Sequence, residues 1–363
     1  MAESMRGGGM ICSGRTIRML VSSMNLTRAL VGFLACAFIL ASPHQAIGAP
    51  LKVLVLTDAA GLGDRGFNDV CWQGVQKAGK EFGFQPKFLQ SREQADYEAN
   101  ITLAAQQADV VVTLGFLFVD ALKGVAPHFP NTRFIHIEGD VPGDNVASYD
   151  FKSEEGGFLA GLIAGLFTKS RKTGVVSGMD IPPVEAYVSG FRAGIKTAEA
   201  ERGAPIEAIA ASAGSFNDPV KGKSLAQALI EKGVDVIFRA AGNTGVGVLD
   251  AVKRADSVYL IVEDLDQDAE LPGKILASTL KRMDVAIYDA FQDVSQGKFR
   301  PGHRWTGVAE GGVGISDMKY SKELFKPADL AAIAKAKELL KEGKIVVPKR
   351  ASEVDAFQAP QGL

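Results

Sequence analysis

The stretch VLVLTDAAGLGDRGFND (residues 53–69) joins an apolar run to a glycine-rich turn and the start of a predicted helix. Gly61, Gly63 and Gly66 follow the G-x-G-x-x-G spacing of a dinucleotide-binding turn. Such a site has its first glycine almost at the end of the strand and an acidic residue at the end of the second strand. Here TDAA separates strand from glycine, and no acid follows the second apolar run before Glu93. The pattern therefore argues against a dinucleotide site.

The same turn presents three side chains at the carboxyl end of the first strand, where open α/β sheets bind ligands. These are Asp58, Phe67 and Asn68. Each also has a structural interpretation: Asp58 or Asn68 could cap a turn or a helix, and Phe67 could be a hydrophobic staple. Their common placement at one strand end favours a role in binding.

Apolar, β-branched runs alternate with amphipathic stretches along the chain. Strands separated by helical patterns predict βαβ units and parallel sheets, and near-continuous apolarity indicates that both sheet faces are covered. The predicted strands are 52–58, 86–91, 108–115, 133–139, 172–179, 206–213, 234–241, 257–264 and 274–279. They are too many for one small sheet, and no eightfold repeat favours a closed barrel. We therefore expect two doubly wound parallel-sheet lobes joined by a hinge.

The expected lobes are discontinuous in sequence. NVASYDF (145–151) leads into a glycine- and alanine-rich segment that suits a tightly packed helix, and GVAEGGVGIS (307–316) has the glycines that hinges tolerate. We expect the first lobe to contain 50–147 and 270–309 and the second to contain 148–269 and 310–363.

The first fifty residues have the layout of a secretory signal. Arg15, Arg18 and Arg28 precede the apolar run ALVGFLACAFIL (29–40), and small residues follow it. A run of about a dozen residues is too short to remain as a helix across about 30 Å of hydrocarbon. We expect residues 1–49 to be removed as a signal peptide, which places the mature protein in the periplasm.

Cys36 offers an alternative, because FLAC loosely resembles the signal for lipid attachment to a cysteine. Phe33 does not suit that signal, and apolar residues continue beyond the cysteine. We therefore expect no lipid anchor. Of the three cysteines only Cys71 remains after cleavage, so the mature chain has no internal disulfide.

Composition and motifs argue against several other classes. A net charge of -2 provides no polybasic surface for nucleic acid or anionic lipid. The four histidines have no metal-ligand spacing, and H-E-x-x-H, G-x-S-x-G and P-loop motifs are absent. DLDQD (264–268) is acidic enough to suggest a calcium-dependent nucleoside hydrolase but lacks the expected pattern. We therefore expect that the protein is not an enzyme and that it binds neither a metal nor a cofactor.

Seven segments in sequence order resemble the basic membrane protein family, the substrate-binding proteins of ABC transporters that are similar to purine nucleoside receptor lipoproteins. The resemblance covers residues from about 52 to about 316. It implies a periplasmic-binding-protein fold of type I with the ligand between two lobes, and a membrane permease as partner. The segments are TDAAGLGDRGFND, NVASYDFKSEEGGFLAGLIAG, SGFRAGIK, GSFNDPVKGKSLAQALIEKGVDVIF, AAGNTGVG, EDLDQD and STLKRMDVAIYD.

The resemblance implies roles for residues around a purine base. Phe67 matches the aromatic that stacks on one face of the base, and Asp58 and Asn68 match the polar pair at its edge. Phe238 matches the aromatic on the opposite face, although core packing is the default for a residue inside an apolar strand. Glu138 stands where the family usually has an aspartate near the base.

The resemblance also implies contacts with a sugar. Gly242 and Asn243 match the turn that borders it, and Asp264 and Lys281 match the acid and the lysine that hold ribose hydroxyls. Because VEDLDQD is longer than the family's run, Asp266 could replace Asp264. The expected ligand is a purine nucleoside, with a free nucleobase or another small heterocycle as the alternative.

Overall fold

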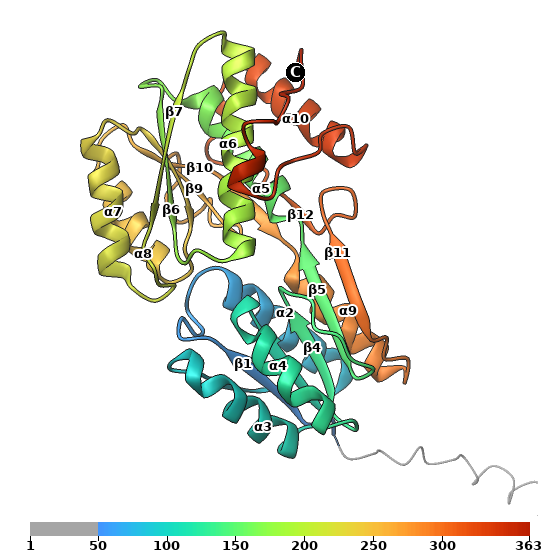
Figure 1. Cartoon of the computed structure of the whole chain (residues 1–363). Coiled ribbons are helices and arrows are strands. Elements are labelled where there is room, and N and C mark those ends of the chain that lie inside the picture. Colours follow the sequence, from blue (N-terminus) through green and yellow to red (C-terminus); the bar gives the residue numbers. More distant parts are fainter. Residues whose placement is uncertain (1–49) are drawn as a thin grey trace, which may run out of the picture. The chain divides into compact units, whose positions relative to one another are not determined.

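The computed structural model describes residues 50–363. Within this range the chain forms two α/β lobes, each built around a six-stranded sheet (Figure 1). This confirms the predicted fold class. The predicted signal peptide, residues 1–49 with Cys36, lies outside the described residues.

The first lobe contains an entirely parallel sheet of order β11-β5-β4-β3-β1-β2. Its strands are β1 (Val53–Thr57), β2 (Lys87–Gln90), β3 (Val110–Leu114), β4 (Arg133–Ile137), β5 (Val146–Phe151) and β11 (Gly302–Thr306). Its helices are α2 (Phe67–Phe82), α3 (Tyr97–Gln107), α4 (Val119–Val125) and α9 (Met283–Ser295), with short 3-10 turns η1 (Gln94–Asp96), η2 (Phe116–Phe118) and η3 (Ala126–His128).

The central strands of this lobe are apolar on both sides because helices cover both sheet faces. All five residues of β3 are buried. Val111 packs in the cluster that contains residues of α3 and α4, whereas Val110 and Val112 pack in the cluster that contains residues of α2 and α9. The run VVVTL therefore predicts a doubly covered strand for a physical reason.

The second lobe has the sheet order β12-β10-β9-β8-β6-β7, parallel except for the β10–β12 pair. Its strands are β6 (Lys172–Ser177), β7 (Glu207–Ser212), β8 (Val236–Ala240), β9 (Tyr259–Val262), β10 (Ile275–Lys281) and β12 (Val313–Ile315). Its helices are α5 (Ser153–Phe167), α6 (Pro182–Arg202), α7 (Pro219–Glu231), α8 (Thr244–Arg254) and α10 (Pro327–Lys341), with 3-10 turns η4 (Lys322–Leu324) and η5 (Ala351–Glu353).

Glycines allow α5 and α6 to pack backbone against backbone (Figure 1). A methyl group on Gly161 would collide with the carbonyl oxygen of Phe191, and one on Gly157 would collide with that of Tyr187. The glycine-rich segment expected to form a tightly packed helix is therefore α5, and its closest partner is α6. This contact also fixes the start of α6, which faces the other lobe.

The chain crosses between the lobes at points that differ from the prediction. All of β5 pairs within the first sheet, so the predicted boundary after residue 147 falls inside a strand. β10 pairs with β9 in the second sheet, so the first lobe resumes at α9 and not at residue 270. The error arose because an apolar run predicts a strand but not the sheet to which it belongs.

All nine predicted strands are present, and three further strands were missed. β5 was interpreted only as a boundary, β11 is a partly exposed edge strand, and β12 has three residues. None of the helices described here is both long and apolar enough to cross a membrane.

Candidate functional site

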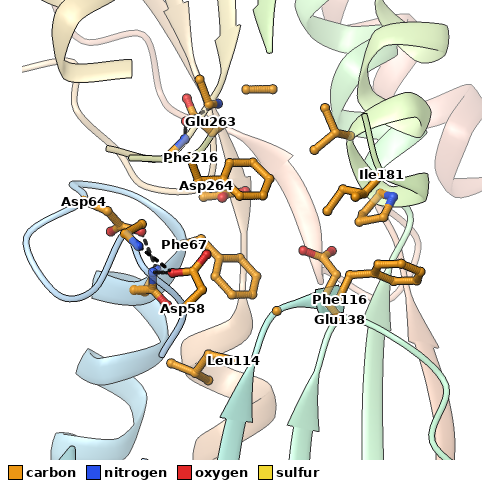
Figure 2. A pocket seen from close by; sticks show the side chains of 18 of the residues that line it. Asp58, Asp64, Phe67, Leu114, Phe116, Glu138, Ile181, Phe216, Glu263 and Asp264 are labelled. Carbon is orange, nitrogen blue, oxygen red and sulfur yellow. Dashed lines mark hydrogen bonds between the residues drawn. The ribbon is translucent and has the colours of Figure 1, made fainter. Parts of the chain in front are cut away.

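A cavity opens between the two lobes, at the carboxyl ends of strands from both sheets (Figure 2). It holds about 650 Å³ of empty space, including the solvent at its mouth. In doubly wound proteins this edge is where ligands bind. The polar residues that line it are Asp58, Asp64, Asn68, Glu138, Glu263, Asp264 and Lys281.

Aromatic rings enter the cavity from both lobes. Phe67, the first residue of α2, and Phe216, in the loop after β7, come from opposite sides (Figure 2). The ring of Phe216 lies against the backbone of Gly178, where any larger side chain would collide with it. Phe116 and Tyr187 add two further rings to the lining. This arrangement can hold a flat, partly apolar ligand between two aromatic faces.

A buried ion cluster joins the two lobes in the cavity wall. The Lys281 ammonium, at the end of β10, contacts both carboxylate oxygens of Glu138, at 2.8 and 3.1 Å. It lies 3.7 Å from Oδ1 of Asp264, which also accepts a hydrogen bond of 2.9 Å from the hydroxyl of Tyr187. Lys281 is 2% exposed. The cluster links a first-lobe acid, Glu138, to second-lobe residues.

The electrostatics of this cluster keep the lysine charged. Burial alone would lower the pKa of Lys281, but the carboxylates of Asp264 and Glu138 outweigh it and raise that pKa well above its usual value. A charged ammonium beside two carboxylates can both donate to and orient hydroxyl groups of a ligand. The aromatic faces of Tyr187 and Phe67 lie 4.9 and 5.7 Å from the ammonium and add a cation–π contribution.

The turn between β1 and α2 is held by another buried acid, Asp64. Its carboxylate accepts backbone N–H bonds from Gly66, Asn68 and Asp69 at 3.0, 2.9 and 3.2 Å. Burial raises the pKa of Asp64 to about 7, although these three bonds favour its ionised form. The network fixes the first turn of α2 and thus the positions of Phe67 and Asn68.

A further buried acid, Glu263, holds the turn after β8. Its Oε1 accepts hydrogen bonds from the backbone N–H groups of Ala241 and Gly242, at 3.1 and 3.2 Å. Its other oxygen lies 3.3 Å from Nε of Arg239, and both side chains are almost fully buried. Gly242 adopts a left-handed conformation, with φ 55°, that favours glycine. The pair therefore fixes the backbone of a turn that lines the cavity.

Seven of the nine predicted site residues line this cavity: Asp58, Phe67, Asn68, Glu138, Gly242, Asp264 and Lys281. Between the two acids left open by the sequence, Asp264 lines the cavity. Asp266 is exposed, and its Oδ1 accepts a bond from the backbone of Asp268.

Phe238 and Asn243 are not brought to the cavity. The ring of Phe238 is fully buried and stacks on Phe191, with centroids 5.6 Å apart and planes 8° apart. Its side of β8 faces α6, so the structure places this ring in the core and not in the cavity. The Asn243 amide instead donates to Oδ1 of Asn217 at 2.7 Å.

Sequence reasoning missed five lining residues that contribute chemistry: Asp64, Phe116, Tyr187, Phe216 and Glu263. Phe216 carried a usable signal, since it closely follows the predicted strand 206–213 and belongs to the quoted segment GSFNDP. Glu263 adjoins Asp264. Tyr187 lies inside a helix, and nothing in its local sequence indicates which side chains it approaches.

Two contacts join the lobes outside the set of residues that line the cavity. Nη1 of Arg65 lies 3.0 Å from Oε2 of Glu270, and Nδ2 of Asn217 donates to the carbonyl oxygen of Ala59 at 2.8 Å. Arg65 and Ala59 belong to the first lobe, and Glu270 and Asn217 belong to the second. Over residues 50–363, no three His, Cys, Asp or Glu side chains are grouped so as to hold a metal ion.

Two lobes around a cavity at their strand ends, with aromatic and charged groups from both sides, define a solute-binding protein of the two-lobed α/β class. Residues 51–351 match the family described as ABC transporter substrate-binding protein PnrA-like, and the chain belongs to this family. The resemblance seen in the sequence is thereby confirmed.

Individual relatives are similar to this chain over most of its length. The chain is 32% identical over 325 residues to a Lactococcus lactis protein named ABC transporter nucleoside-binding protein BmpA, covering 83% of this chain and 90% of that one. It is 28% identical to basic membrane protein A1 of Borrelia garinii, over 71% of this chain and 77% of the relative. A solved solute-binding protein of an ABC transporter system from Aeropyrum pernix K1 superposes with a TM-score of 0.80 at 30% identity, over 85% of this chain and 96% of that one.

Proposed function

We propose that this protein captures a purine nucleoside in the cavity between its lobes and delivers it to the membrane permease of an ABC importer. The observation that carries the proposal is the pairing, in one cavity, of two opposed aromatic rings with a charged Asp264–Lys281 group. Phe67 and Phe216 suit the two faces of a heterocycle, each stack contributing about 1–3 kcal/mol by analogy with single-stranded nucleic acid binding.

In this proposal the ion cluster recognises the sugar. One oxygen of Asp264 accepts the Tyr187 hydroxyl, and the remaining carboxylate capacity accepts ribose hydroxyls while Lys281 donates to them. A 2′-deoxy nucleoside leaves one of these partners unmatched, which costs about 1–3 kcal/mol. We therefore expect ribonucleosides to bind roughly ten- to a hundredfold more tightly than their 2′-deoxy forms.

Calorimetry with guanosine, 2′-deoxyguanosine and guanine tests this proposal, and Asp264→Ala should remove most of the difference between the first two. Mass spectrometry of ligand released from natively purified protein identifies the retained compound directly. Equal affinity for all three ligands would show that the protein does not recognise the sugar. A free nucleobase would then be the better candidate for the natural ligand. Release of free base from guanosine would indicate a hydrolase instead.

Closure of the lobes around the ligand is supported by the contacts that join them outside the cavity. The Arg65 and Glu270 side chains are 51% and 32% exposed, so their ion pair contributes about 0.2–1 kcal/mol. We expect Arg65→Ala to raise the ligand dissociation rate about two- to fivefold. Stopped-flow release measurements should show this effect at low salt and less of it at high salt.

A matched control is Arg254→Ala, because Arg254 forms an exposed ion pair with Asp250 within the same helix. It should leave the dissociation rate unchanged. Equal rates for the unmodified protein and Arg65→Ala at every salt concentration would contradict a role for the Arg65–Glu270 pair in holding the lobes together.

Export is also part of the proposal. The three-part layout of residues 1–49 supports cleavage near Ala49 or Pro50 and release of an unlipidated protein into the periplasm. Intact-mass measurement of the mature protein should give an amino terminus near those residues. Detection of an acylated Cys36 would overturn this part of the proposal.

A further inference from the structure

Six of the side chains that line the cavity contain no nitrogen or oxygen atom, and we call them the apolar wall. They come from the end of β3 and the turn η2 in the first lobe, and from the start of α6 in the second. Most of them are half-buried, so part of their surface remains free. They are Leu114, Phe116, Leu117, Ile181, Pro183 and Val184. Such a surface favours an apolar group of a ligand and offers a hydroxyl group no side-chain partner.

In the first lobe the apolar wall adjoins the ion cluster. β3 and β4 are neighbouring parallel strands in which Leu114 lies beside Ile137, so Phe116 follows β3 near the level at which Glu138 follows β4. Figure 2 shows the ring of Phe116 on the side of Glu138 that faces away from Phe67. The cavity thus extends from the Phe67 ring, past the ion cluster, to the apolar wall.

In the second lobe the start of α6 places the apolar wall beside the same cluster. Val184 lies three residues before Tyr187, so the two side chains share one face of the helix. The Tyr187 hydroxyl donates to Oδ1 of Asp264 at 2.9 Å. The apolar wall therefore borders the ion cluster from both lobes.

The start of α6 also offers few backbone donors to a ligand. Its first two residues, Pro182 and Pro183, have no N–H group. The next two N–H groups, of Val184 and Glu185, donate to the carbonyl oxygen of Ile181 at 3.0 and 2.9 Å. A helix N-terminus binds a phosphate through free N–H groups, and this one has none in its first four residues. Together with the acids of the ion cluster, this arrangement disfavours a phosphate at the apolar wall.

We propose that the apolar wall receives an apolar substituent at C5′ of the bound nucleoside, so that 5′-deoxy-5′-alkylthio purine nucleosides bind more tightly than their 5′-hydroxyl parents. This inference rests on the proposed function, in which C1′ carries the stacked base and the 2′ and 3′ hydroxyls contact Asp264 and Lys281. C5′ is then the remaining substituent of the ribose, and the apolar wall borders the ion cluster on the side away from Phe67. A 5′-hydroxyl there loses water without gaining a partner, whereas an alkylthio group gains apolar contact.

Calorimetry of guanosine, 5′-deoxy-5′-methylthioguanosine and guanosine 5′-monophosphate with the unmodified protein tests this inference. We expect the methylthio compound to bind about tenfold more tightly than guanosine, the effect of one small apolar group in an apolar pocket. The monophosphate should bind about a hundredfold more weakly than guanosine, because its charge lies near the acids of the ion cluster.

The outcomes separate this inference from the proposed function. Guanosine that binds as tightly as the methylthio compound, or more tightly, would overturn the inference and leave the proposed function standing. A monophosphate that binds as tightly as guanosine would also contradict the apolar wall as the site of C5′. Failure of all three compounds to bind would overturn both proposals.

Ile181→Ser tests the assignment to the apolar wall. The change removes an apolar side chain that lines the cavity and keeps the backbone carbonyl that holds the start of α6. Serine is favoured at the position before a helix, so the variant should fold. The preference for the methylthio compound over guanosine should fall to about equal affinity.

Val220→Ser is the matched control, because Val220 is 77% exposed on α7 and is not among the residues that line the cavity. It should leave the ratio of the two affinities unchanged. Folded Ile181→Ser protein that keeps the full preference of the unmodified protein would contradict the assignment.

Discussion

Replacing Lys281 with methionine should lower the free energy of unfolding by about 3–5 kcal/mol, the cost of removing one partner from a buried ion pair. Lys281 is 2% exposed and its ammonium contacts Glu138 at 2.8 Å. Without it, the carboxylates of Glu138 and Asp264 remain buried with no cation beside them. Denaturant unfolding of the unmodified protein and of Lys281→Met at neutral pH measures the loss.

A double variant and a surface control complete this experiment. Glu138→Gln in the Lys281→Met background removes one of the stranded charges and should recover part of the lost stability. Lys341→Met removes a lysine from an exposed pair with Glu338 and should change the free energy of unfolding by less than about 1 kcal/mol. If Lys281→Met is no more destabilised than Lys341→Met, the buried cluster does not stabilise the fold.

The same change should abolish measurable nucleoside binding, because Lys281 is proposed to donate to the sugar and to hold Glu138 of the opposite lobe. Loss of binding in protein that is still folded, checked by circular dichroism, separates this effect from instability. The cluster therefore links stability to binding through one side chain.

Local sequence signals predicted the parts of the fold that local forces determine. An apolar run such as VVVTL predicts a strand that is covered on both faces. Residues 110–114 form such a strand. The sheet to which a strand belongs depends on distant partners. β10 was assigned to the first lobe for that reason, although the strand itself was predicted correctly.

The site residues also divide into those that local sequence predicted and those that depend on distant contacts. Asp58, Phe67 and Asn68 were predicted together because they lie in one short segment at the end of a predicted strand. All three line the cavity. Tyr187 reaches the cavity only because α6 packs against the glycines of α5, among them Gly157. Such a contact joins segments that carry no local sign of each other.

Phe216 and Phe238 differ by position within their elements. Phe238 lies inside β8, where alternate side chains point to opposite sheet faces, and its side faces the core under α6. Phe216 lies in the loop after β7, where the chain leaves the sheet and a side chain can turn into the cleft. The two aromatics stand in one quoted segment, so motif resemblance alone does not distinguish them.

Phe238→Ala should therefore mainly reduce stability, whereas Phe216→Ala should mainly weaken binding. Phe238 is fully buried against Phe191, so Phe238→Ala should lower the free energy of unfolding by about 3–5 kcal/mol. Phe216 is half-buried at the cavity, so Phe216→Ala should destabilise the fold much less. It should instead weaken nucleoside binding about tenfold or more through the loss of one stack.

Denaturant unfolding and calorimetry on both variants measure the two effects separately, with affinity expressed per folded molecule. Phe67→Ala provides a matched comparison, because it removes the ring proposed to stack on the opposite face and should weaken binding to a similar extent. Folded Phe216→Ala protein that binds guanosine as tightly as the unmodified protein would exclude the clamp formed by Phe67 and Phe216. Folded Phe238→Ala protein with normal stability would contradict the core role assigned to Phe238.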